Sequence, residues 1–308
     1  MRNVATIVFD AIYEEKISRV IAYVQGGGNV NLRDETGSTL LHRAVHQGSI
    51  DLVAWLLQHG ATVNATDGYG NTPLHIACIY GRRDLADLLL RHGADVDSTT
   101  DRKDWTPLMV AINENDLDMA DWLISQGADL NHVDREQGWT PLLLACEQGL
   151  KEMIIKLIDR GGRVDAKVTD GDARGRSAIH LASYYGDIDT VRALIRQGVD
   201  IDQQPEGGGL TALHWAVYNV HVDLLEFLLA HGANVNIQAS SLYQQRAPLH
   251  FAVAARNEHM AQLLLESGAD PLLKDSEGQS PVDMALLRYR EHGSGIYERL
   301  LRLLESYI

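Results

Sequence analysis

A repeat with a period of about 33 residues runs along the sequence and constrains its fold more than any other feature. The motif Thr-Pro-Leu-His, often in a variant form, recurs at spacings of 33 to 37 residues. An alanine lies five residues after each start, and a glycine lies 21 residues after the first eight starts. The copies start at Thr6 (a degenerate copy), Thr39, Thr72, Thr106, Thr140, Ser177, Thr211, Ala247 and Ser280. A regular period of this kind predicts an array of similar stacked units.

Each unit is predicted to contain two short helices. In the third unit, Thr72 is the expected N-cap, and Pro73 occupies the first helical position, where no N–H is needed. Gly81 can adopt the left-handed conformation that ends this helix. The second helix has one apolar face, formed by Leu85, Leu88 and Leu89. Because one helix pair has too little apolar surface to fold alone, the units must stack.

The motif, the Gly-Ala-Asp at 93–95 and the 33-residue period together resemble the ankyrin repeat family over essentially the whole chain. The resemblance implies an all-α fold, a curved ankyrin-repeat solenoid of stacked helix-turn-helix units with turn or hairpin fingers and divergent caps at both ends. We expect a single domain over residues 1–308. Its nine approximate repeats are 1–34, 35–67, 68–100, 101–134, 135–170, 171–205, 206–240, 241–275 and 276–308.

Two features near the C-terminal end give local predictions. The segment from Ile296 to Tyr307 has apolar residues at 296, 300, 303, 304 and 307, so we expect a helix that covers the apolar face of the eighth repeat. Val220 and Arg256 stand where the third unit has Gly81. Because valine resists positive φ, we expect the helix ends there to shift, onto Asn219 and Asn257.

A histidine and a cysteine three residues apart raise the question of reactive or metal-binding chemistry. His75 and Cys78 share one helix face, and such a pair can activate a thiol or bind zinc. However, the repeat that holds Cys146 has Leu143 at the histidine position, so the two residue types do not occur together. We therefore interpret both cysteines as buried, inert thiols. The resemblance implies that the motif histidines hydrogen-bond the backbone of the motif and of the neighbouring repeat.

Other patterns also favour a structural interpretation. The sequence has no Walker-type loop, HExxH, CxxC or GxSxG. The glycine runs 26–28 and 207–209 fall where a helix stop and a finger turn are needed. His59, His92 and His231 each precede a helix-ending glycine, where an imidazole suits the negative end of the helix dipole. We expect no catalytic, cofactor-binding or metal site, and no cofactor.

Composition narrows the classes of partner. A formal net charge of −15 disfavours nucleic acid and anionic lipid and favours a basic protein partner. Two cysteines in 308 residues give no disulfide framework and fit a reducing compartment. The sequence has no run of 18 apolar residues and no signal-peptide pattern at its start. We expect a cytoplasmic monomer that does not enter a membrane.

The expected binding surface combines aromatic and acidic residues. By resemblance, the ankyrin binding face comprises the finger tips, the residues just before the motif and the exposed end of the first helix of each repeat. Residues 101–134 hold eight acids against two basic residues. The candidate partner-binding residues in these slots are Tyr80, Asp101, Asp104, Trp105, Glu114, Trp139, Tyr184, Tyr185 and Tyr218.

These features predict a non-catalytic protein–protein interaction module, either an adaptor or an inhibitor that covers its partner's functional surface. A dedicated cytosolic antitoxin or immunity-type inhibitor of an enzyme would have the same sequence features. An alternative of another class is an enzyme with a site in the two long fingers, at 165–177 and 236–247. Loop extensions on one face of a solenoid are often functional, and we leave open whether these fingers contact the partner.

Overall fold

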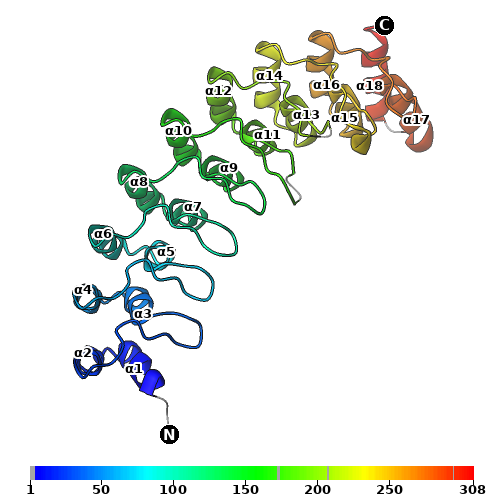
Figure 1. The fold of residues 1–308 in the computed structure, drawn as a ribbon. Helices are drawn as coiled ribbons and strands as arrows, with labels where there is room; N and C mark the ends of the chain where they lie inside the picture. Colours follow the sequence, from blue (N-terminus) through cyan, green and yellow to red (C-terminus); the bar gives the residue numbers. More distant parts are fainter. Residues whose placement is uncertain (1–3, 172–173, 207, 294) are drawn as a thin grey trace. The chain divides into compact units, whose positions relative to one another are not determined.

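The computed structural model describes residues 4–171, 174–206, 208–293 and 295–308. The described chain is helical, with only two isolated β-bridges, Arg33 to Thr39 and Lys167 to Ser177, at the bases of fingers. It divides into two compact units, residues 1–136 and 137–308. The all-helical solenoid fold predicted from the repeat is confirmed, and each unit has the alternating helices of this fold (Figure 1). The prediction of one domain over residues 1–308 stays a prediction.

The first unit consists of four helix pairs. The odd-numbered helices form one layer, in which α1, α3, α5 and α7 pack in sequence, and the even-numbered helices form the other. The fingers leave the layer of odd-numbered helices, called the inner layer below (Figure 1). The helices are α1 (Val4–Tyr13), α2 (Ile17–Gln25), α3 (Leu40–Gln47), α4 (Ile50–Gln58), α5 (Pro73–Ile79), α6 (Arg83–Arg91), α7 (Pro107–Asn113) and α8 (Leu117–Ser125).

The second unit continues the same alternation within residues 137–308. Its inner helices are α9, α11, α13, α15 and α17, and a short 3-10 helix lies in the finger before α15. The elements are α9 (Pro141–Glu147), α10 (Lys151–Asp159), α11 (Ala178–Tyr184), α12 (Ile188–Arg196), α13 (Ala212–Tyr218), α14 (Val222–Ala230), η1 (Ser241–Tyr243), α15 (Pro248–Ala254), α16 (Glu258–Glu266), α17 (Pro281–His292) and α18 (Gly295–Glu305).

The helices form where capping and apolar spacing predict them. Helix α5 starts at Pro73 after Thr72, and α7 starts after Thr106, whose hydroxyl accepts the backbone N–H of Met109 at 3.3 Å. The apolar face of α6 is built from Leu85, Ala86 and Leu89. The expectation that Leu88 completes this face is wrong in detail, because Leu88 is only half-buried and the smaller Ala86 faces the core.

The predicted shift of two helix ends is wrong. Val220 has φ 60° and Arg256 has φ 56°, the conformation that Gly81 adopts at φ 61°. Helices α13 and α15 have seven residues, as α5 does. The turn keeps its backbone hydrogen bonds, since Val220 N–H donates to Val217 O at 3.2 Å and the next N–H donates to Ala216 O at 2.8 Å. The packed repeat therefore imposes the left-handed conformation even on a β-branched residue.

The two ends of the array differ from the sequence expectation in small ways. Thr6 lies inside α1, so it is not an N-cap. Helix α18 packs against α16 and α17 with Leu300 and Leu304 fully buried, which confirms that it covers the eighth repeat. Tyr297, which was not among the apolar positions expected to face the core, is also buried, whereas Tyr307 is exposed.

The glycine runs lie partly within the described chain. Gly27 has φ 90° and follows the end of α2, as a helix stop requires. Gly207 lies outside the described residues, while Gly208 has φ 77° in its finger. Within the described ranges, no helix is long and apolar enough to cross a membrane.

Candidate functional site

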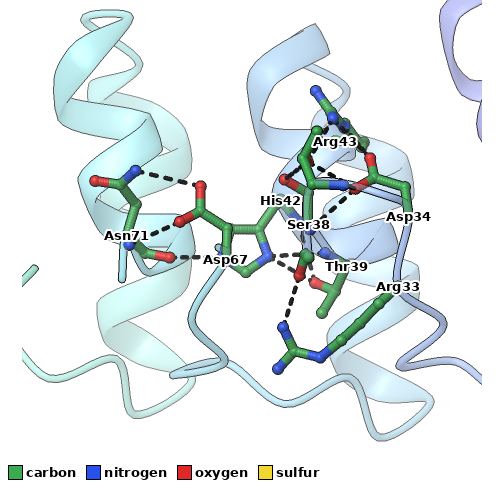
Figure 2. Close-up of polar contacts among 10 residues, drawn as sticks. Arg33, Asp34, Ser38, Thr39, His42, Arg43, Asp67 and Asn71 are labelled. Carbon is green, nitrogen blue, oxygen red and sulfur yellow. Dashed lines mark hydrogen bonds and ion pairs between the residues drawn. The ribbon is translucent and has the colours of Figure 1, made fainter. Parts of the chain in front are cut away.

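The motif histidines join neighbouring repeats through their two ring nitrogens. In the second repeat, Thr39 N–H donates to His42 Nδ1 at 3.1 Å, while His42 Nε2 lies 2.9 Å from the carbonyl oxygen of Asn71 (Figure 2). Because Nδ1 accepts, Nε2 carries the proton and donates to that carbonyl. His75, His214 and His250 repeat this arrangement onto the carbonyls of Trp105, Arg246 and Gln279, at 3.0 to 3.1 Å, whereas His180 Nε2 lies 2.8 Å from the carbonyl oxygen of Gln203, at the end of its own repeat. The structural role implied for these histidines is confirmed.

Burial keeps these imidazoles neutral. Desolvation lowers the pKa of His75, His180 and His214 to about 4, against the raising effect of the hydrogen bond that each makes to a backbone carbonyl. The pKa values of His42 and His250 are lowered by the same cause. At neutral pH these rings are hydrogen-bonding groups of the scaffold and carry no charge.

A polar network fixes the finger of the second repeat beside its helix. Asp34 accepts the backbone N–H of Thr36 at 2.9 Å and pairs with Arg43 at 2.6 Å (Figure 2). Burial raises the pKa of Asp34, but the hydrogen bonds from Thr36 and Arg43 outweigh it, so the pKa is lowered overall. This finger is therefore an ordered platform on which exposed side chains can be held in place.

The two cysteines are inert. Cys78 and Cys146 are at most 1% exposed, and burial raises the pKa of each thiol far above its usual value. Within the described residues, no group of three or more His, Cys, Asp and Glu side chains could hold a metal ion. The interpretation of both cysteines as buried thiols is confirmed.

The histidines before the helix-ending glycines contact helix carbonyls. Nδ1 of His59, His92 and His231 lies 2.7 to 2.9 Å from the carbonyl oxygen four residues earlier. His59 also stacks on Trp55, with ring centroids 3.7 Å apart. These side chains satisfy carbonyls at helix C-termini, as the dipole argument predicts.

Trp105 lies at the edge of a groove in the first unit. The groove has a volume of about 230 Å³ and runs between Tyr69, Ile79 and Trp105. Trp105 is half-buried, and its indole Nε1 donates to Asp134 at 3.4 Å. Lys103 Nζ lies 3.9 Å from the ring centroid, so the chain's own cation already covers this ring.

The acids predicted beside Trp105 differ in exposure. Asp101 is exposed, and exposed Glu114 lines the groove. Asp104 is only 6% exposed and pairs with Arg135 at 3.2 Å and His132 at 3.4 Å. Its side chain therefore holds the finger together, and a partner could reach only the other two carboxylates.

Tyr80 and Trp139 take different environments in their respective units. Tyr80, in the first unit, is exposed and meets His46 edge-on, with centroids 4.6 Å apart. Trp139, in the second unit, is half-buried, and its Nε1 donates to Gln137 Oε1 at 3.0 Å.

Five aromatic side chains form a continuous row on the inner layer of the second unit. We call Tyr184, Tyr185, Trp215, Tyr218 and Phe251 the aromatic row. Consecutive rings meet edge-on, with centroids 5.0 Å (Tyr184 to Tyr185), 5.3 Å (Tyr184 to Trp215), 5.9 Å (Trp215 to Tyr218) and 6.1 Å (Tyr218 to Phe251) apart. Tyr184, Tyr185 and Tyr218 are 39%, 47% and 57% exposed. The row thus presents aromatic surface across helices α11, α13 and α15.

Trp215 anchors this row. It is buried with Leu210 and Ala239, and Phe251 and Tyr243 pack against that cluster. The Arg176 guanidinium lies 4.9 Å from its ring centroid. Its indole Nε1 is buried with no hydrogen-bond partner among the described residues. Leaving this buried donor unpaired costs free energy.

A family model described as ankyrin repeats in three copies matches residues 8–100, 97–170, 163–239 and 179–275. These matches span most of the chain. The chain belongs to the ankyrin repeat family.

Curated relatives share the repeats over part of their length. The mouse B-cell lymphoma 3 protein homolog is 32% identical over 127 residues, which is 41% of this chain and 27% of the relative. The mouse nuclear factor NF-kappa-B p105 subunit is 29% identical over 131 residues, 42% of this chain and 13% of the relative. Human palmitoyltransferase ZDHHC13 is 31% identical over 104 residues, which is 34% of this chain and 16% of the relative. The chain thus matches about a quarter or less of each of these relatives.

A solved structure shares the fold. The human ASB11 ankyrin repeat domain is 28% identical with a TM-score of 0.62, and the match covers 76% of this chain and 98% of that one. Ankyrin repeats are modules of protein–protein interaction, so this chain carries the scaffold of a protein-binding surface.

Sequence reasoning missed two members of the aromatic row. Trp215 and Phe251 lie four residues after their repeat starts, a position held by aliphatic residues in four other ankyrin repeats and by Arg43 in the second. Comparing this position across the repeats would have found both rings. Arg176 lies just before the motif, in the slot that holds Trp105 and Trp139, but only the fold brings it and Tyr243 onto Trp215.

Proposed function

We propose that this ankyrin repeat protein is a non-catalytic adaptor or inhibitor that binds a partner protein through its fingers and inner helices. The aromatic row of the second unit carries the proposal. Exposed aromatic rings, closely packed and backed by a buried cluster, supply large contact area at low cost in side-chain entropy, which is typical of binding hot spots. Tyr80 and the Trp105 groove offer a second, smaller contact region in the first unit.

The long finger at 236–247 extends the aromatic row. Tyr243 packs against the buried cluster under the row, and Leu242 beside it is 88% exposed. A large apolar side chain held at a finger tip gains free energy when a partner covers it. We therefore include this finger in the binding surface. The finger at 165–177 contains residues outside the described ranges and is not part of the proposal.

We further propose that the partner is a basic protein and that this chain acts as a cytoplasmic monomer. The net charge of −15 supports a basic partner, and so do exposed carboxylates next to the aromatic residues. Burial raises the pKa of Tyr185, and the nearby charge of Glu147 raises it further, so this carboxylate acts at the row itself. Such charges speed the approach of a basic surface more than they strengthen the final complex.

Affinity capture with matched variants tests the proposal. Wild-type protein and a Tyr185→Ala/Tyr218→Ala variant would each be used to capture proteins from native lysate, with mass spectrometry as the readout. Tyr307→Ala, which removes an exposed tyrosine from the end of α18, is the control. We expect one partner to be retained by wild type and control. For the double variant we expect binding to be roughly 30-fold weaker or more, as loss of a hot spot of about 2 kcal/mol predicts.

Two results would contradict the proposal. The first is equal retention of the same partner by the double variant and wild type. The second is turnover of a substrate by the purified wild-type protein, since the proposal is of a non-catalytic protein. Because Tyr185 and Tyr218 are well exposed, thermal unfolding should show that both variants remain folded.

A further inference from the structure

A pocket lined by arginines lies at the C-terminal end of the inner layer in the second unit. It has a volume of about 280 Å³ and opens between the ends of α15 and α17 and the start of α18. Its polar lining consists of Arg246, Arg256, Arg288, His292 and Tyr297, with Val253, Ala254 and Met284 completing the wall. We call it the arginine pocket.

The charge of this pocket is opposite to that of the chain. The sequence has 42 acidic residues against 27 Lys and Arg, yet no carboxylate lines this pocket. Arg246 pairs with Asp275 at 3.3 Å, and Arg288 pairs with exposed Glu291 at 3.2 Å. Asp275 has no exposed side-chain surface, so it neutralises Arg246 from beneath the pocket.

Among the three arginines of the pocket, Arg256 is the one that is not paired with a carboxylate in the described chain. Its Nε donates to the hydroxyl of buried Tyr297 at 3.0 Å, and its guanidinium lies 5.4 Å from the Tyr297 ring centroid. In the part of the chain that the structure describes, it makes no ion pair with Asp or Glu. A guanidinium has five N–H donors in a planar fork that fits a carboxylate or phosphate, so Arg256 retains capacity for an anion.

The side chain of Arg256 replaces a glycine of the repeat. The equivalent position holds glycine in four of the repeats, and Arg256 takes the left-handed conformation there with φ 56°. The conformation belongs to the turn of the repeat, since Asn115 and Val220 adopt it at the equivalent positions with φ 57° and 60°. It places a guanidinium at the end of α15, where glycine would leave the pocket without this charge.

We propose that the arginine pocket binds an anionic side chain of the partner protein, a carboxylate or a phosphorylated residue, with Arg256 and Arg288 as its main contacts. The inference rests on the proposed function, since it assigns a chemical group to a partner of this surface. Arg246, which lines the pocket, lies in the finger directly before α15. Helix α15 also carries Phe251 of the aromatic row. One peptide segment could therefore contact the row and the pocket together.

A local anionic group is compatible with a basic partner. The strong negative charge of the chain repels extended polyanions such as RNA, whereas a single carboxylate or phosphate within a basic segment meets only the pocket. The acids elsewhere would then guide the approach of the basic segment, and the pocket would fix its register.

Small anions test the pocket without knowledge of the partner. Inorganic phosphate and acetate would each be titrated into the full-length protein at constant ionic strength, with NMR signals of the arginine Nε–Hε groups as the readout. We expect saturable shifts at Arg256 and Arg288, with a Kd on the order of 1 mM for an ion this small. Arg256→Gln and Arg288→Gln should weaken binding at least about tenfold, as loss of a charged hydrogen bond predicts.

Arg290→Gln is the matched control, because Arg290 is exposed on the same helix as Arg288 and does not line the pocket. It should leave both titrations unchanged. Saturation by phosphate only would assign a phosphorylated side chain, and saturation by both ions a carboxylate or a phosphate. Non-saturating shifts, or equal shifts in Arg256→Gln and wild type, would overturn the proposal.

Two further measurements separate the possible failures. Tight binding of a single-stranded RNA oligonucleotide that Arg256→Gln abolishes would overturn the assignment to a protein side chain. If Arg256→Gln captured the partner as strongly as wild type while the aromatic variant lost it, the pocket assignment would fail and the proposed function would stand.

Discussion

The motif histidines show how one residue links sequence, packing and pH. Each accepts a backbone N–H within its own repeat and donates to a backbone carbonyl, which belongs to the next repeat for all of them except His180, so it satisfies two buried backbone groups at once. The same burial disfavours the imidazolium. Protonation would remove the acceptor at Nδ1 and break the link inside the repeat.

This link predicts loss of stability in mild acid. His75, His180 and His214 have a pKa of about 4 in the folded chain against about 6.5 when unfolded, so the unfolded chain takes up protons first as the pH falls. The contribution of these neutral histidines to the free energy of unfolding is fully present above pH 6.5. It is lost as the pH falls from 6.5 to 4, by at most about 3 kcal/mol per histidine. Urea unfolding at pH 7.5, 6.0 and 5.0 measures the loss.

A variant isolates one histidine in this window. His75→Met copies the residue that the fourth repeat carries at Met109, and methionine does not titrate. Its free energy of unfolding should depend less steeply on pH than that of wild type. The carboxylates with lowered pKa, Asp34, Asp275 and Asp283, contribute only as the pH approaches 4 and below. Equal slopes for variant and wild type between pH 6.5 and 5 would show that His75 is not responsible.

Val220 gives a prediction about backbone strain. It is a β-branched residue at φ 60°, and half of its surface is exposed, so its side chain gains little from burial. Val220→Gly should relieve the strain and raise the free energy of unfolding by about 1 kcal/mol, after the entropy cost of glycine is subtracted. Asn115→Gly is the control, since Asn115 has φ 57° and asparagine tolerates this region. A destabilised Val220→Gly protein would show that the side chain makes contacts worth more than the strain.

At the scale of the elements, the sequence predicted the helices well because each repeat has residues that mark where its first helix begins and ends. Threonine or serine before the first helix and a left-handed residue after it recur in nearly every copy. Errors arose where one residue departs from the pattern. A lone valine at a glycine position suggests a changed helix end, but the backbone hydrogen bonds of the stacked turn decide the conformation. Local preference gives way to tertiary packing there.

The covering role of α18 can be tested with single substitutions. Leu304 is fully buried on α18, whereas Leu287 on neighbouring α17 is 42% exposed. Leu304→Ala should lower the free energy of unfolding by about 2 to 5 kcal/mol, and Leu287→Ala should change it by well under half of that. Hydrogen exchange should also speed up in residues 241–275, because α16 loses its cover. Unchanged exchange there would mean that α18 does not stabilise the eighth repeat.

At the scale of the whole molecule, the candidate surface was only partly predictable. Exposed tyrosines could be assigned from their position after the motif, since equivalent positions in a repeat share an environment. Contacts between fingers and helices could not, because they depend on side chains far apart in sequence. The hydrogen bond from Trp105 to Asp134, the ion pair of Asp104 with Arg135, and the five polar side chains of the arginine pocket all arise in this way. The net charge of the chain gave no indication that this acidic protein has a cationic pocket.

Exposed carboxylates on the inner layer of the first unit are expected to guide the approach of a partner. Asp101 and Glu114 are the exposed carboxylates near the Trp105 groove, while Asp104 is excluded because it is buried in ion pairs. Asp101→Asn with Glu114→Gln should slow association with the captured partner by roughly two- to fivefold at low salt and flatten its salt dependence, with little change in dissociation. Stopped-flow or biosensor kinetics between about 20 and 300 mM salt measures both rates. Over this range the Debye length falls from about 20 to about 6 Å, so the screening of the carboxylates changes strongly.

The control removes the same amount of charge from the other layer. Asp84→Asn with Asp118→Asn neutralises two exposed carboxylates in the first turns of outer helices α6 and α8. If steering is local to the inner layer, this variant should associate nearly as fast as wild type. An equal fall in both double variants would show that net charge alone draws the partner in, and the Trp105 groove would then have no part in its approach.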